Sequence, residues 1–247
     1  MRGLTTSVRY VVAGLFAIVL LSLAAPCAAQ DVDTPSVPSA PDTPDRRGSI
    51  FAPSTWVVVS APVQQRVDVK LYAFYIGDLN APVVQADVPI RVNKLLTITP
   101  SYMYYSVPPS GLIELSPQAR GAVDSYDEQQ FRIDGTLAFA VDKFEISARG
   151  MYVRRFRPGV ADDINRYRGK VSIAHPITVG GSTWKPFTAY EAYYEPQGGG
   201  WNRDRIWSGI TVPVTRHVMF QPSYMWETSQ GSPTVNYLLF GLILNTK

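Results

Sequence analysis

The sequence predicts an all-β protein: a transmembrane antiparallel up-and-down β-barrel of about ten strands, with twelve as the alternative count. The region from Asn165 to Trp226 contains successive segments of about a dozen residues that alternate in character. Short turns or a Gly-rich loop separate them, as in a β-meander. Such segments exceed the roughly 5–6 residues of most soluble strands and fit the ~9–11 residues that a tilted strand needs to cross a bilayer.

Composition agrees with a barrel. A hydrophobic fraction of 46% excludes a largely disordered chain. The mean hydropathy of −0.02 is close to that of a soluble protein. Barrels give such values because their lipid-facing and lumen-facing residues alternate along each strand and cancel in the average.

The first 29 residues have the three-part layout of a secretory signal peptide. Arg2 and Arg9 precede the apolar run at residues 11–23, and small residues suit cleavage after Ala29. A signal anchor is the alternative, but the run is shorter than the ~20 residues of a spanning helix. Lipidation of Cys27 is disfavoured because a proline directly precedes it.

Removal of this peptide changes what charge and cysteine content imply. Lys+Arg falls from 23 to 21, because Arg2 and Arg9 are lost, against 20 Asp+Glu. The basic character therefore belongs mostly to the signal peptide, and no nucleic-acid partner is implied. The chain has one cysteine, and it leaves with the peptide, so we expect no disulfide and no cysteine-based catalytic or metal site.

Residues 30–53 are predicted to be a disordered tether, and residues 54–247 the barrel. The tether contains prolines 35, 38, 41 and 44 among Asp, Ser and Thr, with too little apolar surface to fold. We expect strands at residues 54–61, 66–76, 83–92, 95–105, 129–141, 144–156, 166–178, 183–194, 202–214, 217–227 and 235–245.

In the segment at residues 129–141, apolar and charged residues alternate, so that each type lies on its own face of the strand. Phe131, Ile133 and Leu137 alternate with Arg132 and Asp134. Because successive side chains of a strand point to opposite faces, one face suits lipid and the other a polar lumen.

Tight and loose connections alternate along the chain, as periplasmic turns and surface loops do in these barrels. Ten strands would place both ends of the barrel on the periplasmic side. Counting the segment at 54–61 gives eleven, so either this segment packs outside the ladder or a twelfth strand is hidden. Prolines inside the predicted strands remove ladder donors, and we expect bulges to accommodate them. They are Pro89, Pro100, Pro186, Pro213 and Pro222.

A soluble β-sandwich is the alternative fold. The signal peptide, the long segments and the Tyr and Trp residues near segment ends favour the membrane, since such rings prefer the interface. We therefore predict location in the outer membrane of a Gram-negative bacterium. The expected partners are the lipid bilayer and, during biogenesis, the barrel-assembly machinery and periplasmic chaperones.

The order of several short motifs resembles the family named domain of unknown function 2490. These motifs are Trp56, Asn165-Arg166-Tyr167-Arg168, Pro186-Phe187, Tyr190-Glu191, Tyr194, Asn202-Arg203, Gly209 and Pro222-Ser223-Tyr224. The resemblance covers about residues 54–247 and implies an outer-membrane β-barrel without an established activity. The chain departs from barrels generally at its end, where the usual terminal aromatic residue is missing.

The predicted lumen carries charges of both signs, which either form a polar pathway or pair across strands and plug a narrow barrel. We expect pairing, with Arg166–Glu191 and Arg203–Glu191 as specific pairs, because unpaired buried charges are costly. The candidate ion-pair residues are Arg132, Asp134, Glu145, Arg149, Arg166, Arg168, Glu191, Arg203, Arg205 and Glu227.

The sequence gives little support for a catalytic, metal-binding or phosphate-binding site. His175 and His217 are the only histidines, and their expected positions at strand ends do not favour a metal or catalytic site. The Gly-rich loop at residues 198–200 lacks the features of a phosphate-binding loop. We predict no cofactor and no catalytic residues, and a structural or binding function. A porin-like channel is the first alternative, and an outer-membrane lipid hydrolase or protease is the second.

Overall fold

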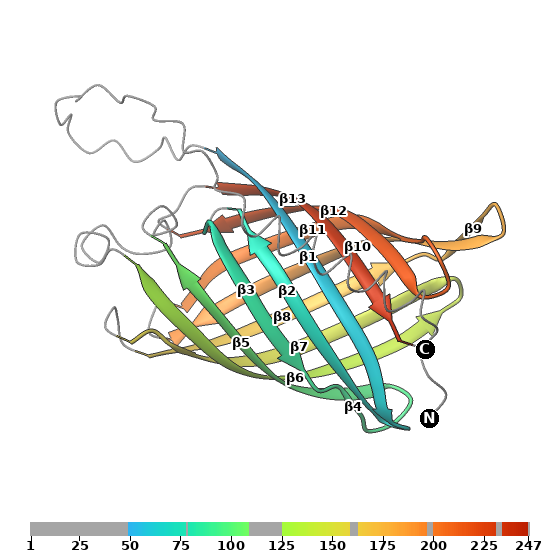
Figure 1. The fold of residues 1–247 in the computed structure, drawn as a ribbon, viewed down its shortest axis with the longest axis horizontal. Coiled ribbons are helices and arrows are strands. Elements are labelled where there is room, and N and C mark those ends of the chain that lie inside the picture. The colour runs from blue at the N-terminus through green and yellow to red at the C-terminus, as the bar shows by residue number, and fades with distance from the viewer. Residues whose placement is uncertain are drawn as a thin grey trace, which may run out of the picture. The chain divides into compact units, whose positions relative to one another are not determined.

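The computed structural model describes residues 49–77, 79–108, 125–158, 163–196, 200–230 and 234–246. In these residues thirteen strands form one sheet that closes on itself (Figure 1). The strands are β1 Ser49–Gln64, β2 Val67–Ile76, β3 Ala81–Asp87, β4 Ile90–Arg91, β5 Leu96–Val107, β6 Tyr126–Val141, β7 Phe144–Phe156, β8 Ile164–Ala174, β9 Ile177–Val179, β10 Ser182–Glu195, β11 Gly200–Pro213, β12 Val218–Ser229 and β13 Thr234–Asn245. The predicted signal peptide and most of the predicted tether lie outside the described residues.

The wall of the barrel has eleven positions. β4 continues β3 between the same two neighbours, β2 and β5, and β9 continues β8 beside β10. Neighbouring strands are antiparallel except at the seam, where β1 pairs with β13 in parallel and with β2 antiparallel. The predicted all-β barrel is therefore confirmed, as a mixed barrel.

The expected strand count needs correction from about ten to eleven. The segment at residues 54–61 is part of β1 and lies within the ladder, and no twelfth wall strand occurs in the described residues. A closed barrel needs an even number of strands only if every neighbouring pair is antiparallel, and the parallel pairing of β1 with β13 removes that requirement. β1 also begins at Ser49, five residues before the predicted start of the barrel at residue 54.

The connections divide between two rims, which we call the loop end and the turn end. The loop end carries the connections at residues 77–80, 108–125, 157–163, 196–199 and 230–233, and the turn end those at 65–66, 92–95, 142–143, 180–181 and 214–217. Ser49 lies opposite Thr234 at the loop end, whereas Asn245 lies opposite Ser60 at the turn end. The two ends of the barrel thus lie at opposite rims, and the prediction that both are on one side was wrong.

Local chemistry explains several of these features. Gly180 and Gly181 have φ angles of 58° and 80°, as the two central residues of a tight hairpin between β9 and β10 require. Two predicted proline sites coincide with breaks in strands. Pro89 lies between β3 and β4, and Pro186 faces the interruption between β8 and β9, where its carbonyl accepts a 3.0 Å bond from the His175 N–H.

The two faces of the wall follow the predicted alternation. On β6, Arg132 and Asp134 are 8% and 7% exposed, whereas Phe131, Ile133 and Leu137 are about half exposed. The barrel is therefore polar inside and apolar outside. Buried apolar clusters occur in addition, one around Tyr105 on β5 and one around Tyr237 on β13.

None of the described residues forms a helix long and apolar enough to cross a membrane.

Candidate functional site

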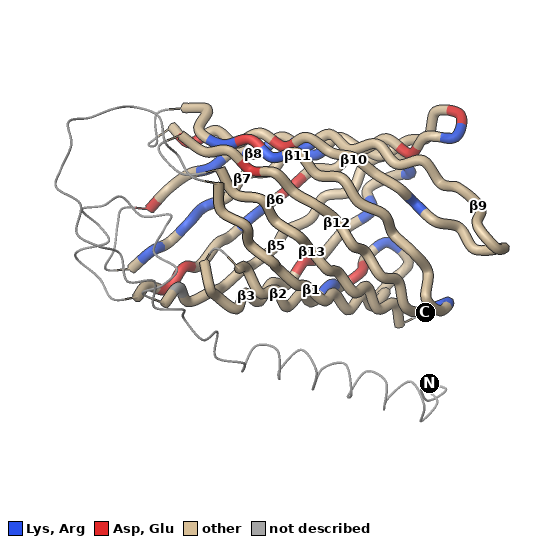
Figure 2. The backbone as a smooth tube through the Cα atoms, turned by 90° about the horizontal axis from the view of Figure 1, so that it is seen from above, with Lys and Arg blue, Asp and Glu red and all other residues tan. Residues whose placement is uncertain are grey.

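The candidate site is the charged interior of the barrel. Both signs of charge occur close together around β8, β10 and β11 (Figure 2). Alternate residues of these strands point inward, so Arg166, Arg168 and Lys170 of β8 share one side of the wall with Glu191 of β10 and Arg205 of β11.

Glu191 is the centre of this interior. Its side chain is completely buried and accepts hydrogen bonds from Arg149 Nη2 at 3.1 Å and Arg168 Nη2 at 2.8 Å. Arg205 Nη1 lies 3.9 Å from its second oxygen, which also accepts a 3.0 Å bond from the Tyr193 hydroxyl. One carboxylate therefore neutralises parts of three guanidinium groups, from β7, β8 and β11.

Tyr193 fills the space beside this carboxylate. Its side chain is 1% exposed, and four arginines surround its ring. The guanidinium carbons of Arg168, Arg205, Arg166 and Arg203 lie 4.6, 5.0, 5.3 and 5.6 Å from the ring centroid. These distances are within the ~6 Å range of cation–π attraction, which is strongest where water is excluded. The Tyr193 ring thus lowers the electrostatic free-energy cost of holding four positively charged guanidinium groups close together.

A second group of ion pairs lies nearer the loop end. Arg155 binds the fully buried Glu128 through two parallel bonds of 2.6 Å, from Nε and Nη2. Gln130 donates to the same carboxylate at 2.5 Å. Arg155 also approaches Glu195 at 3.6 Å, and Glu195 pairs with Arg166. The chain of contacts crosses from β6 to β10 and leaves these charges paired, as buried charges must be.

A fourth carboxylate connects to Glu191 through a shared arginine. Glu227 on β12 pairs with Arg205 and lies 3.4 Å from Arg203 Nη1. Because Arg205 contacts both Glu191 and Glu227, the network extends across β7, β8, β10, β11 and β12. At the turn end, by contrast, Glu145 and Lys185 form a pair whose side chains are about half exposed.

The structure places the predicted ion-pair residues on the inward face, with some different partners. Arg166 pairs with Glu195, and Arg203 lies beside Glu227, whereas Glu191, the partner expected for both, is held by other arginines. Arg132 lies 3.7 Å from the Met103 sulfur, and Asp134 accepts a 3.1 Å bond from Thr136.

Sequence reasoning missed four members of the network. They are Glu128, Arg155, Tyr193 and Glu195. Glu128 and Glu195 each lie one residue beyond a predicted strand end, so the alternation was not extended to them. Arg155 lies on the same face as Arg149, six residues along β7, and that periodicity could have found it.

The histidines do not form a catalytic arrangement. The His175 ring packs against Phe144 in a tilted arrangement, with 5.0 Å between centroids, and His217 lies in the turn between β11 and β12. Within the described strands and turns, neither imidazole is hydrogen-bonded to a serine or a carboxylate. The same residues contain no group of three or more His, Cys, Asp or Glu side chains placed to hold a metal ion.

Comparison with known proteins identifies the family. The family model described as "Protein of unknown function (DUF2490)" matches residues 56–237, more than half of the chain. The chain therefore belongs to this family, and the resemblance seen in the sequence is confirmed. No curated protein gives a match.

Several solved structures align with the chain at low identity. LpxR from Salmonella typhimurium aligns with a TM-score of 0.48 and 10% identity over 72% of this chain and 83% of that one. The KdgM porin in complex with disordered oligogalacturonate aligns with a TM-score of 0.41 and 9% identity, over 70% and 82%. The siderophore receptor PirA from Pseudomonas aeruginosa has a TM-score of 0.28 and 9% identity, over 72% of this chain and 35% of that one.

Proposed function

We propose that this member of the family is a bacterial outer-membrane β-barrel with an interior closed by paired charges, acting as a structural or binding protein and not as an open channel. Two features support the proposal: the chemistry of the outward face, which suits a bilayer, and the packing of the interior around Glu191 and Tyr193, which are almost completely buried.

The outward face carries a belt of aromatic rings near the loop end. Tyr152, Tyr167, Tyr194 and Trp201 follow one another across β7, β8, β10 and β11, with centroid separations of 5.5, 6.4 and 5.3 Å. Tyr and Trp prefer the boundary between lipid and water, where the ring is half apolar and the polar tip stays hydrated. The belt therefore supports a membrane boundary near the loop end.

The height of the apolar band supports the same setting. On the outward face of β10, Trp184 near the turn end and Tyr194 near the loop end are ten residues apart. At roughly 3.3 Å per residue this is about 33 Å of strand, or about 25 Å along the barrel axis at a tilt of about 40°. The apolar band of outer-membrane barrels is also about 25 Å tall. Their long loops face outward, which would place the loop end at the cell surface.

The observation that carries the proposal of a closed interior is the almost complete burial of Glu191 together with Tyr193 in the part of β10 nearer the loop end. A channel needs water along its axis, and water would expose these side chains. They are instead covered by the arginines of β7, β8 and β11. Barrels of about eight strands have interiors that side chains fill, whereas those of about 16–18 strands leave an aqueous channel. The present wall is closer to the first case, so an ion-paired plug is physically reasonable.

Single-channel recording of refolded protein in a planar bilayer tests the proposal. We expect no stable conductance steps from the unmodified chain. Tyr193→Ala removes the ring at the centre of the plug and should produce small steps. Tyr190→Ala, on the outward face of the same strand, is the matched control and should remain silent. Stable steps from the unmodified chain would overturn the closed interior and favour the porin-like alternative.

A further inference from the structure

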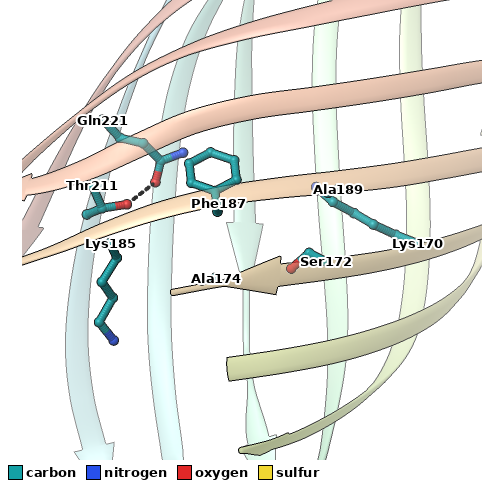
Figure 3. A pocket seen from close by; sticks show the side chains of 8 residues that line it. All are labelled: Lys170, Ser172, Ala174, Lys185, Phe187, Ala189, Thr211 and Gln221. Atoms are coloured by element: carbon teal, nitrogen blue, oxygen red, sulfur yellow. Dashed lines mark hydrogen bonds between the residues drawn. The ribbon is translucent and has the colours of Figure 1, made fainter. Parts of the chain in front are cut away.

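The interior contains a pocket between the Glu191 network and the turn end. It has a volume of about 270 Å³ and lies against β8, β10, β11 and β12. Figure 3 shows Lys170 and Lys185 at opposite ends of the pocket, with Phe187 between them and the hydrogen-bonded pair of Thr211 and Gln221 on one side. This region is not part of the ion-paired plug.

The two lysines of the pocket differ in their partners. Lys185 holds Glu145 through bonds of 2.9 and 3.0 Å. Lys170 is the cross-strand neighbour of Glu191, but that carboxylate is occupied by arginines, and no carboxylate in the described part of the barrel forms an ion pair with Lys170. Its Nζ instead lies 4.3 Å from the centroid of the Trp207 ring.

The surroundings of Lys170 carry an excess of positive charge. Glu191, which lies opposite Lys170 across β8 and β10, is the shared counter-charge of Arg149, Arg168 and Arg205. A half-buried ammonium among three guanidinium groups is costly unless a negative charge balances it. An anion that enters the pocket from the turn end would supply that charge.

The remaining lining defines the kind of anion. Ala174, Phe187 and Ala189 present apolar surface, while Ser172 and Thr211 offer hydroxyl groups. A volume of about 270 Å³ is just below the roughly 300–1,000 Å³ of sites for drug-sized ligands, so the ligand is small. An apolar wall beside one ammonium that has no carboxylate partner suits an organic monoanion better than a phosphate. Phosphate prefers bidentate arginines, and the arginines beside Lys170 are held by Glu191.

We propose that this pocket binds a small organic carboxylate from the turn end, with Lys170 holding the carboxylate group and Phe187 packing against the ligand body. The site extends the proposed binding role of the barrel, but it does not depend on the absence of conductance. A failure here would leave the closed interior intact, and conducting protein would leave the pocket intact.

A ligand-observed ¹⁹F NMR titration tests this inference. The probe is 4-fluorobenzoate, added to the refolded full chain in uncharged detergent micelles, and 4-fluorobenzamide is its neutral counterpart. We expect saturable binding of the benzoate alone. Lys170→Met should weaken it by about 10- to 100-fold, as expected for loss of one contact to a charged group. Lys143→Met removes the same charge from the exposed turn between β6 and β7 and should leave binding unchanged.

A second variant tests the position of the ligand without changing charge. Ala174→Leu adds volume to the pocket lining and should also weaken binding by at least about tenfold. Heat-dependent mobility on gels will show that each variant has folded, and Ala174→Leu carries the test if Lys170→Met has not. Equal binding of the benzamide, or unchanged binding by both variants, would overturn the proposal. Inorganic phosphate that binds more tightly than the benzoate, with the same sensitivity to Lys170→Met, would overturn the choice of a carboxylate.

Discussion

Removal of the Glu191 carboxylate should strongly destabilise the barrel. The side chain is fully buried and lies within 3.1 Å of two arginines and 3.9 Å of a third. Glu191→Ala leaves these guanidinium groups without their common counter-charge. Breaking a buried ion pair by removal of one partner costs about 3–5 kcal/mol. At about 1.4 kcal/mol for each factor of ten, the folding equilibrium constant should fall by roughly 100- to 4,000-fold.

Equilibrium unfolding in urea, followed by tryptophan fluorescence in detergent micelles, measures this loss. With a slope of about 3 kcal/mol per molar urea, the midpoint should fall by about 1–1.7 M. The matched control is Glu145→Ala, because Glu145 and its partner Lys185 are 50% and 44% exposed. An exposed pair contributes only about 0–1 kcal/mol. A midpoint for Glu191→Ala as high as that of the control would refute the role assigned to the buried network.

Two further predictions concern the seam and the orientation of the barrel. A Cβ atom at Gly241 would lie 2.1 Å from the Trp56 ring, so Gly241→Val should displace that ring and cost about 1–3 kcal/mol by overpacking. Gly150→Val, with no atom within 4 Å of the new Cβ, should leave the urea midpoint nearly unchanged, and equal effects would contradict this account. In intact cells, a membrane-impermeant maleimide should label Ser49→Cys at the loop end but label Lys143→Cys only after the outer membrane is permeabilised. The reverse pattern would contradict the orientation.

The faces of the wall were predictable because they depend on local alternation. Arg132 and Asp134 are buried and Phe131 is exposed, as the period of two on β6 requires. The ends of strands were less predictable, since turn and loop residues can continue a ladder when their neighbours do. Because the predicted strands ended one residue short of them, Glu128 and Glu195 were not predicted to face the lumen. Both nevertheless follow the same alternation.

The parallel seam could not be predicted from local pattern. Alternation in β1 indicates which side chains face inward, but it is the same whether the neighbouring strand runs up or down. The seam depends on contacts between residues far apart in the chain, such as Trp56 against the bare backbone of Gly241. A glycine in the last strand gives no signal that an indole from the first strand will cover it.

Strand order also does not determine which charged residues form ion pairs with one another. Glu191 and Lys170 are directly opposite across β10 and β8, yet Glu191 is held by Arg168, which is two residues away along β8. Arg149 reaches it from β7, one strand further. Arginine side chains are long enough to contact diagonal neighbours, so the partner is determined by three-dimensional packing and not by register.

The two halves of the interior restrict how a ligand could reach Lys170. Glu191 and Tyr193 close the path from the loop end, so under the proposed orientation access is from the periplasmic, turn end. At that end a ligand first meets Lys185, whose charge is already balanced by Glu145. A dicarboxylate that used both lysines would have to displace Glu145 and leave that carboxylate without its partner. A monocarboxylate held at Lys170 alone avoids this cost and is therefore the favoured ligand.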